Sequence, residues 1–472
     1  MRHFEPEDRK LAGDAPDRVM LSRLWSALGG KPEIADTVEL AGEGSLASVF
    51  AVSDFAAAAI GAAGLALAEW TAARTGSVPE AHVDRRLASL WFSFSIAPQG
   101  WDLPAVWDAI AGDYPAADGW IRLHTNAAAH RAAALSVLGA APEDGLNRAA
   151  VAARVAGWRA DELEAAVVAA GGCAAAMRGL DQWAGHPQGR AVMAEPLMRM
   201  DLGGGARAFA SGFDAARPLA GIRVLDLTRV LAGPVATRFL AGFGADVLRI
   251  DPPGWDEGAI IPEVTPGKRC ARLNLKQAGD RERFTALLKD ADVLVHGYRA
   301  DALEALGLGA EVRRGLNPGL IDVSLNAYGW TGPWANRRGF DSLVQMSGGI
   351  AEAGMVRSGA ERPVPLPVQA LDHGAGYLMA AAAVRGLTMR HFHATGSRWR
   401  TSLARVGAFL AGFEQGPVAD PIGKPVPADY SADVEQTAWG PALRLRPAVR
   451  LEGAAMAWDR PAAGLGTSAP EW

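Results

Sequence analysis

The sequence predicts an α/β protein in which a parallel, Rossmann-like sheet forms a large domain beside a smaller α+β domain. Between residues 218 and 325, short β-branched runs alternate with helix-like segments, as in a parallel sheet covered on both faces. Earlier in the chain, residues 46–72 and 128–180 are rich in Ala with helical spacing, and a strand-like run at 118–125 lies between them.

The large domain begins with the apolar strand 222–227, which a Gly/Pro loop and a helix follow at 230–245. Such sheets bind ligands at the carboxyl ends of their strands. Further strands are expected at 246–251, 271–275, 292–297 and 319–325, with helices at 280–289 and 301–307.

The chain has 472 residues, which is long for a single core, so several domains are expected. Residues 1–200 are predicted to hold a partial repeat and the small α+β domain. Residues 201–217 are Gly/Ala-rich and read as a linker. Residues 218–420 form the large domain, and residues 421–472 form a C-terminal tail that packs back on it.

Composition narrows the classes of function. A net charge of −5 argues against a nucleic-acid-binding surface. Two cysteines, Cys173 and Cys270, provide neither a metal cluster nor a disulfide framework, and the charged start lacks a secretory apolar region, so a cytoplasmic protein is expected. Residues 46–67 are apolar enough to suggest a membrane span, but Asp54 within them favours a buried helix.

An internal repeat is the most informative pattern. Residues 51–76 and 369–396 each contain an aspartate, an Ala/Gly-rich helical run and a Thr-Gly pair. The aspartates are Asp54 and Asp372, and the pairs are Thr75-Gly76 and Thr395-Gly396. We interpret this pattern as an internal duplication.

At 219–251, the stretch LAGIRVLDLTRVLAGPVATRFLAGFGADVLRID resembles family III CoA-transferases, which include formyl-CoA and carnitine CoA-transferases and α-methylacyl-CoA racemase. The resemblance continues through 268–276, 291–309, 316–334 and 339–349 to LPVQALDHGAGY at 366–377 and the tail at 457–472. The segments at 118–126, 158–175 and 186–190 resemble the small domain of the same family. The chain is therefore similar to a rearranged duplicate with one large and one small domain.

The resemblance implies that Asp372 is the catalytic nucleophile. A carboxylate near a helix N-terminus is stabilised as the anion, and it can attack a thioester to give a covalent intermediate. Gly374 and Gly376 would let the backbone approach the substrate and offer N–H donors to an oxyanion. From the residues alone, the reading of Asp372 as a helix cap is favoured, and the resemblance to the family reverses that preference.

The other repeat and the neighbouring residues suggest different roles. Asp54 lacks the neighbouring glycines, and no nucleotide fold precedes it, so we interpret it as a cap left over from duplication. Phe340 stands where the racemase branch of the family has a catalytic histidine, which argues against racemisation. His373, beside Asp372, is the alternative base.

Coenzyme A is the implied cofactor, bound as the substrate, and neither a metal nor NAD or FAD is expected. The loop 228–234 lacks the dinucleotide glycine pattern. The resemblance places CoA contacts at Val230, Leu231, Ala232, Leu273, Lys276, Tyr298 and Arg338. The residues Lys268, Arg269, Arg337 and Arg338 are candidates for the CoA phosphates or for a solvated basic face.

Three readings of function follow from the sequence. The first is a CoA-transferase that moves CoA from an acyl-CoA to a free carboxylate through an aspartyl intermediate. The second is an acyl-CoA racemase or isomerase, which Phe340 disfavours. The third is a catalytically decayed CoA-binding subunit, because Pro252, Gly297 and Ala305 replace polar residues common in the family.

The expected partners are acyl-CoA and carboxylic acids, without nucleic acid or membrane. The family forms interlocked dimers, which implies a homodimer. The rearranged order of segments is also compatible with a monomer. The sequence identifies neither the acyl group nor the acceptor.

Overall fold

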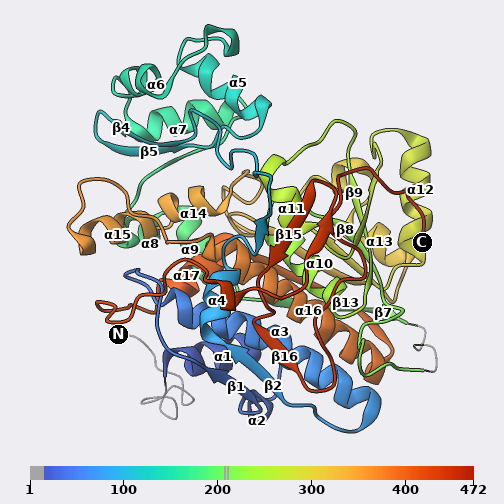
Figure 1. Cartoon of the computed structure of the whole chain (residues 1–472). Coiled ribbons are helices and arrows are strands. Elements are labelled where there is room, and N and C mark those ends of the chain that lie inside the picture. Colours follow the sequence, from blue (N-terminus) through green and yellow to red (C-terminus); the bar gives the residue numbers. More distant parts are fainter. Residues whose placement is uncertain (1–14, 207–208, 210–211) are drawn as a thin grey trace.

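The computed structural model describes residues 15–206, 209 and 212–472. Its centre is a seven-stranded sheet with the order β10-β9-β8-β11-β12-β13-β7 (Figure 1). The first six strands are parallel, and β7 is antiparallel to β13. The strands are β7 (Arg199–Gly205), β8 (Arg223–Leu227), β9 (Asp246–Asp251), β10 (Lys268–Arg272), β11 (Val293–His296), β12 (Ile321–Asn326) and β13 (Thr395–Ser402).

Both faces of this sheet are buried, because successive apolar side chains of each strand enter different cores. The valines of β8, β9 and β11 belong to the core that includes α10 (Ala232–Gly242) and α16 (Ala370–His393). The leucines that follow them belong to the core that includes α12 (Ala278–Lys289). This pattern confirms the predicted α/β class with a mostly parallel sheet.

The order of the strands reverses between β8 and β11. The chain passes from β8 outward to β9 and β10, and then returns to build β11, β12 and β13 on the other side. The loops after β8 and β11 therefore meet at the topological switch point, where such sheets bind ligands. The predicted loop 228–234 is one of these two loops.

Two predicted elements of the large domain differ in the structure. The strand expected at 271–275 is found at Lys268–Arg272, because Asn274 turns the chain by accepting a hydrogen bond from the Lys276 N–H (3.2 Å). The helix expected at 301–307 is only a short 3₁₀ turn, η4 (Glu304–Leu306), which ends at Gly307 with φ 71°. The helix after it is α13 (Ala310–Leu316).

The N-terminal region is built around α3 (Val52–Thr75), which packs against α16 of the large domain. Around α3 lie α1 (Pro16–Ala27), α2 (Pro32–Ala35), β1 (Val38–Ala41), β2 (Ala81–Asp84), α4 (Arg85–Trp91) and β3 (Ile96–Pro98). By length and composition, α3 could cross a membrane, but 89% of its most apolar stretch is buried inside the protein. The interpretation as a core helix agrees with this burial.

The small domain has its own core and projects from the rest of the molecule (Figure 1). Its antiparallel sheet has the order β4-β5-β6. Its elements are β4 (Gly112–Ala116), β5 (Gly119–Leu123), α5 (Ala128–Val137), η2 (Pro142–Asp144), α6 (Arg148–Val155), α7 (Ala160–Ala169) and β6 (Ala174–Ala176).

Further helices follow the small domain, connect strands of the large sheet, or follow that sheet. They are α8 (Leu180–Gly185), α9 (Pro187–Ala194), η3 (Gly258–Ile260), α11 (Ile261–Val264), α14 (Asp341–Ser347), α15 (Ile350–Ser358) and α17 (Leu403–Leu410). The tail contains η5 (Pro427–Asp429), β14 (Glu435–Thr437), β15 (Gly440–Arg444) and β16 (Val449–Leu451).

The repeat read from the sequence is a repeated unit of structure. The N-terminal repeat is α3–β2–α4 and the C-terminal repeat is α16–β13–α17. Helices α3 and α16 both have 24 residues and end at a left-handed residue. In each repeat the last helix starts directly after the strand, capped by Asp84 or by Ser402. The matching helix ends are Gly76 and Ala394, so the proposed equivalence of the two Thr-Gly pairs is wrong by two residues.

Each repeat takes an edge strand from the other part of the chain. β7, from the N-terminal region, pairs with β13, whereas β16 of the tail pairs with β2. Residues 201–205, expected to be a linker, therefore belong to β7. The tail packs on the large domain, where Trp472 bonds the Leu287 carbonyl (3.0 Å), and also on the N-terminal region, where β15 pairs with β3.

Candidate active site

Asp372 lies in the first turn of α16, at the carboxyl edge of the large sheet. It is 8% exposed, and in the described part of the chain no side chain donates a hydrogen bond to its carboxylate. Its backbone N–H, together with that of Leu371, donates to Asp341 Oδ2 at 3.0 and 2.9 Å. Asp341 therefore caps α16 from outside the helix and leaves the Asp372 carboxylate unpartnered.

Asp341 is held by α14, of which it is the first residue. Its other oxygen accepts a hydrogen bond from Gln345, whose own oxygen accepts from the Leu366 N–H (2.7 Å). Burial raises the pKa of Asp341 to about 6. Burial and the neighbouring Asp341 raise the pKa of Asp372 well above its ordinary value. Asp341, which accepts three hydrogen bonds, is the carboxylate that holds the charge.

This arrangement corrects the expectation that the helix end keeps Asp372 ionised. Without a ligand, burial and the Asp341 charge outweigh the helix dipole, because the first-turn N–H groups of Leu371 and Asp372 serve Asp341. Burial and the Asp341 charge raise the pKa of Asp372, so these two effects favour its protonated form.

The two glycines after Asp372 serve packing rather than substrate contact. A Cβ on Gly374 would lie 2.2 Å from the ring of Phe55 in α3. A Cβ on Gly376 would lie 2.4 Å from the carbonyl oxygen of Ala232 in α10. Both residues lie beyond the free first turn of α16, so their N–H groups belong to the helix. The close approach of Gly376 to Ala232 joins the predicted nucleophile to the predicted CoA loop.

That loop, 228–231, has an unusual backbone. Val230 has φ 62°, a left-handed conformation that a β-branched residue rarely adopts and that often marks a functional site. Leu231 and Ala232 are buried, with 3% and 4% exposure. The Val230 N–H donates to Glu257 Oε1 at 2.6 Å.

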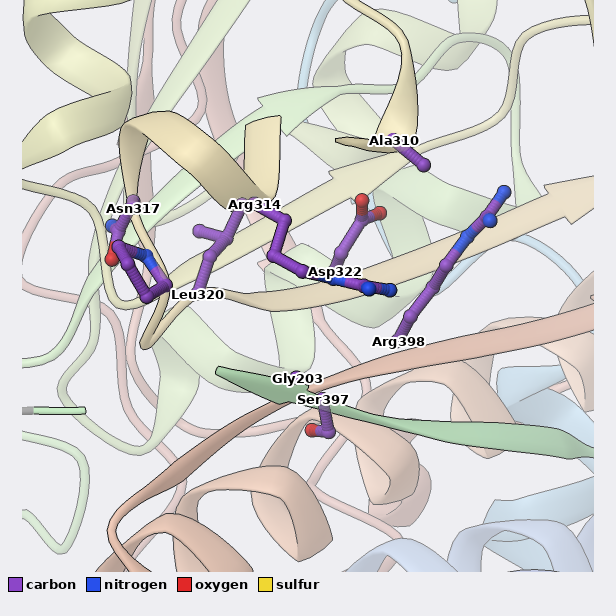
Figure 2. A pocket seen from close by; sticks show the side chains of 9 residues that line it. Gly203, Ala310, Arg314, Asn317, Leu320, Asp322, Ser397 and Arg398 are labelled. Atoms are coloured by element: carbon purple, nitrogen blue, oxygen red, sulfur yellow. The ribbon is translucent and has the colours of Figure 1, made fainter. Parts of the chain in front are cut away.

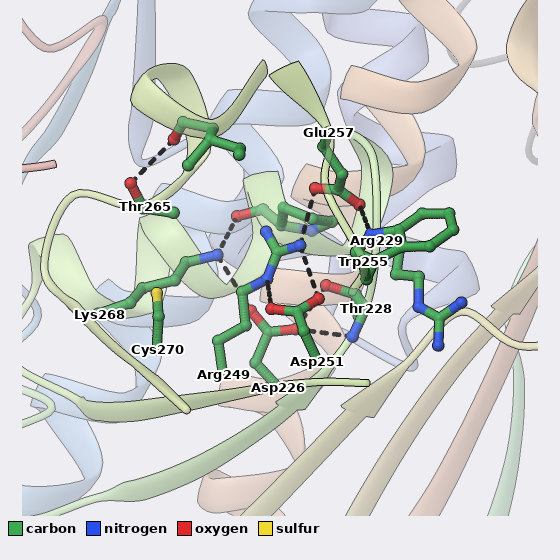
Figure 3. A network of polar contacts seen from close by, with 12 residues as sticks. Asp226, Thr228, Arg229, Arg249, Asp251, Trp255, Glu257, Thr265, Lys268 and Cys270 are labelled. Atoms are coloured by element: carbon green, nitrogen blue, oxygen red, sulfur yellow. Dashed lines mark hydrogen bonds and ion pairs between the residues drawn. The ribbon is translucent and has the colours of Figure 1, made fainter. Parts of the chain in front are cut away.

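Glu257 is part of a buried polar network behind the loop (Figure 3). Besides Val230, it accepts hydrogen bonds from Arg249 (2.7 Å) and from the Trp255 indole N–H (2.9 Å). Arg249 is fully buried and also binds Asp251 at 2.8 Å. The strained loop is thus held by a carboxylate whose charge Arg249 neutralises.

The remaining basic candidates have structural partners. Lys268 is fully buried and donates to Asp226 (3.0 Å) and to Thr237 (2.6 Å), so it is not available for a CoA phosphate (Figure 3). Arg269 binds Asp246 at 2.7 Å, and Arg337 binds Glu164 at 2.8 Å. None of the three is the solvated basic side chain that one reading of the sequence suggested.

Tyr298 lies in the loop after β11, at the switch point. Its hydroxyl accepts a hydrogen bond from Arg229 at 3.3 Å, and the Arg229 guanidinium lies 5.0 Å from the Tyr298 ring and 4.5 Å from the Trp255 ring. Arg229 therefore joins the loops that follow β8, β9 and β11.

The other predicted CoA contacts are dispersed. Leu273 is buried in the core beneath α12, whereas Lys276 is exposed beyond β10. Arg338 is exposed in the loop after β12, near His130 of the small domain. Burial and the charge of Arg338 lower the pKa of His130. The structure therefore brings four of the predicted residues to the switch point: Val230, Leu231, Ala232 and Tyr298. Among the described residues, Arg338 makes no contact with these four.

Asp54 does not cap α3. Its carboxylate accepts two hydrogen bonds from Arg85, at 2.9 and 3.0 Å, and no backbone N–H in the described residues donates to it. Arg85 is the first residue of α4 and is further held by Ser45 (2.9 Å) and the Gly44 carbonyl (2.8 Å). The interpretation as a leftover cap is wrong, because Asp54 forms a side-chain ion pair.

His373 is a packed core residue. It stacks on Phe92 with 5.4 Å between ring centroids, and burial holds its pKa well below the ordinary value. Its Nδ1 has no partner in the described structure. Phe340 stacks on His124 of the small domain at 3.8 Å, which brings that domain against the residue next to Asp341.

Sequence reasoning missed Asp341, Glu257 and Arg85. Asp341 follows Phe340 in the stretch GFD, which drew attention only to its missing histidine. Glu257 follows β9 in a Pro/Gly loop without regular periodicity. The position of Arg85 directly after an apolar strand, within the repeat, was the available signal for a partner of Asp54.

A small cavity of about 20 Å³ lies at the opposite edge of the sheet (Figure 2). It has room for about one water molecule. Its walls come from the starts of β12 and β13 and from β7, and they include Arg314, Asp322, Ser397 and Arg398. This cavity is therefore remote from the carboxyl edge where Asp372 lies.

Comparison with known proteins finds a family that the large domain resembles. Residues 219–432 match CoA-transferase family III. An acyl-CoA transferase from Fusarium pseudograminearum is 34% identical over 209 residues, which cover 39% of this chain and 45% of that protein. A formyl-CoA:oxalate CoA-transferase from Rhodopseudomonas palustris is 33% identical over 195 residues, which cover 39% and 45% of the two chains.

Solved structures also resemble part of the chain. The crystal structure of Rv3272 from M. tuberculosis has 30% identity and a TM-score of 0.38, covering 42% of this chain and 58% of that one. A CAIB/BAIF family protein from Brucella suis has 26% identity and a TM-score of 0.37. The chain spans less than half the length of the curated relatives named above.

Proposed function

We propose that the chain, whose residues 219–432 match CoA-transferase family III, transfers CoA from an acyl-CoA thioester to a free carboxylate, with Asp372 as the nucleophile. The observation that carries this proposal is the position of Asp372. It is an unpartnered carboxyl group at the N-terminus of α16, and Gly376 of the same helix packs against Ala232 of the switch-point loop.

In the first half of the reaction, the ionised Asp372 attacks the thioester carbonyl carbon, and the C–S bond breaks to release CoA thiolate. This leaves a mixed anhydride between Asp372 and the acyl group. The thiolate then attacks the Asp372 carbonyl, which forms an aspartyl-CoA thioester and releases the acyl group as a carboxylate.

The second half reverses these steps with the acceptor. The acceptor carboxylate attacks the aspartyl-CoA thioester, forms a new mixed anhydride and releases CoA thiolate. Attack of the thiolate on the acceptor carbonyl gives the new acyl-CoA and restores Asp372. No proton is consumed overall, but Asp372 must first lose its proton to react.

Asp341 positions Asp372 and controls that proton. By accepting hydrogen bonds from the N–H groups of Leu371 and Asp372, it holds the first turn of α16, while its charge adds to burial in raising the pKa of the Asp372 carboxyl. We propose that activity rises with pH as Asp372 ionises. For CoA itself, we propose contacts at the switch point, with Tyr298 and the backbone of 230–232.

Trapping of the covalent intermediate tests this proposal. The protein is incubated with acetyl-CoA and then with hydroxylamine, and peptides are analysed by mass spectrometry. We expect a hydroxamate at Asp372, absent in Asp372→Asn and retained in Asp54→Asn. Modification at Asp54 alone would move the active site to the N-terminal repeat.

A second candidate is a CoA-binding protein without transferase activity. The observation that favours it is the burial of Asp372 beside Asp341, which raises the pKa of the Asp372 carboxyl, since a neutral carboxylic acid is a poor nucleophile. Tight binding of CoA without formation of any hydroxamate, at every pH between about 6 and about 9, would support this candidate over the transferase.

A further inference from the structure

A cavity of about 570 Å³ lies between the small domain and the large domain. One wall is α7, and the opposite wall is the loop 333–337 that follows β12. Its volume falls within the range of sites for small organic ligands, which often lie at such domain junctions. Its lining residues are Asp161, Glu164, Ala165, Val168, Arg178, His186, Pro333, Trp334, Asn336 and Arg337.

Two arginines and one buried carboxylate form the base of this cavity. Glu164, with a side chain 5% exposed, accepts hydrogen bonds from Arg178 (2.6 Å), Arg337 (2.8 Å) and the Ala176 N–H (3.1 Å). Burial opposes its charge, but the two guanidinium groups hold the pKa of Glu164 below its ordinary value. Glu164 is therefore fully engaged and cannot serve as an acceptor for a ligand.

Several donors of the cavity remain free in the described structure. The Nε of Arg337 is buried without a hydrogen-bond partner. His186 Nδ1 accepts the Gln188 N–H at 3.1 Å, so the neutral ring carries its proton on Nε2. Burial and Arg178 lower the pKa of His186, which keeps it neutral. Asn336 adds an exposed amide at the rim.

The rest of the lining is apolar. Ala165 and Val168 line the cavity from α7, and Pro333 and Trp334 line it from the opposite loop. The Trp334 ring lies 4.0 Å from the Arg337 guanidinium and 4.5 Å from the His186 ring, which fixes the indole beside the free donors. A ligand in the cavity would thus meet hydrogen-bond donors beside an apolar surface.

We propose that this cavity binds a small carboxylic acid as its anion. The carboxylate accepts hydrogen bonds from Arg337 and from His186 Nε2, and the apolar body lies against Trp334 and Val168. A cation is disfavoured because Glu164, the buried carboxylate among the lining residues, already binds Arg178 and Arg337. This binding does not require Asp372, whose helix contributes no residue to the lining.

Calorimetric titration with benzoate tests the proposal, with benzamide as the uncharged control. We expect benzoate to bind and benzamide to bind at least about tenfold more weakly, because a charge-assisted hydrogen bond is lost. Asp372→Asn should bind benzoate unchanged, which separates this site from the proposed transferase chemistry.

Two exposed positions provide matched variants with opposite effects. Asn336→Asp adds a negative charge at the rim and should weaken benzoate binding about two- to fivefold. Asp161, with a side chain 78% exposed, binds Arg178 at 2.6 Å, so Asp161→Asn should strengthen binding about twofold. Equal binding of benzoate and benzamide, absence of heat with benzoate, or no response to both substitutions would overturn the proposal.

Discussion

The two repeats place an aspartate at the same point of the same structural unit, but only one of these carboxylates has a counterion. Asp54 is bound by Arg85, the first residue of α4. The residue at the same place of the C-terminal repeat, directly after β13, is the buried Leu403. Asp372 therefore meets Asp341 instead of a guanidinium group. This difference shows that the position of a carboxylate in a helix does not by itself decide which charged group it meets.

The difference between Leu403 and Arg85 separates two roles. Asp54 is held by two hydrogen bonds from Arg85, and this ion pair stabilises the junction of α3 and α4. An unpaired Asp372 contributes no ion pair to stability, but it stays free to react. The following predictions would break or sharpen this contrast.

The largest expected effect is on activity. Asp372→Asn should lower the rate of CoA transfer at least about 10³-fold, because the covalent step loses its nucleophile. The rate of acyl-CoA consumption with a carboxylate acceptor measures this loss. Asp54→Asn should retain turnover, and equal losses in both variants would end the distinction between the repeats.

The next effect is on stability. Arg85→Met should lower the free energy of unfolding by about 3 kcal/mol, because it leaves Asp54 buried without a partner. Urea denaturation measures the change. The double variant Arg85→Met with Asp54→Asn should recover part of the loss, since no unpaired charge remains. A loss as large in the double variant would show that Arg85 acts through packing alone.

The next prediction concerns the packing of α16 against α3 near their N-termini, where a glycine of one helix faces a phenylalanine of the other. Gly374→Ala should destabilise the protein by about 2 kcal/mol, because the new methyl group meets Phe55 at 2.2 Å. Thermal unfolding measures the shift. Leucine is smaller than the Phe55 ring, so Gly374→Ala should cost less stability in a Phe55→Leu background than in the wild-type chain. If the losses of stability from the two substitutions simply add, this contact is contradicted.

The smallest expected effect is on the pH dependence of the rate. Asp341→Asn keeps an oxygen acceptor for the N–H groups of α16 but removes the charge that raises the pKa of Asp372. The pKa of Asp372 should fall, so the rising limb of the pH–rate profile should move to lower pH. Asp341→Ala, which removes the acceptor too, should also lower the maximal rate. An unmoved limb in Asp341→Asn would show that burial alone sets the pKa.

The same shift has a consequence for stability. The pKa of Asp372 is higher in the folded than in the unfolded chain, so its contribution is complete below the unfolded pKa and is lost as pH rises through the folded pKa. Asp372→Asn removes this dependence, and its unfolding free energy should therefore vary less with pH than that of the wild-type chain.

Local pattern was sufficient for most of the fold. The runs at 222–227 and 246–251 match β8 and β9, because each contains a Val-Leu pair whose two side chains are buried on opposite faces of the sheet. The Asp54 and Asp372 repeat was visible because both helices keep small residues where α3 and α16 pack together. Residues 201–205 of the predicted linker form a strand instead, because they pair with β13 as part of β7.

The candidate site was predicted less completely. The sequence by itself determined the α/β class, the repeated helices, and the place of Asp372 and the loop 228–234, since these depend on periodicity and local chain geometry. Only the tertiary structure decided that Arg85 pairs with Asp54, that Asp341 caps α16, and that Glu257 holds Val230. Those contacts join residues on different elements, and their energies depend on burial and on the distances between charges, which local pattern does not encode.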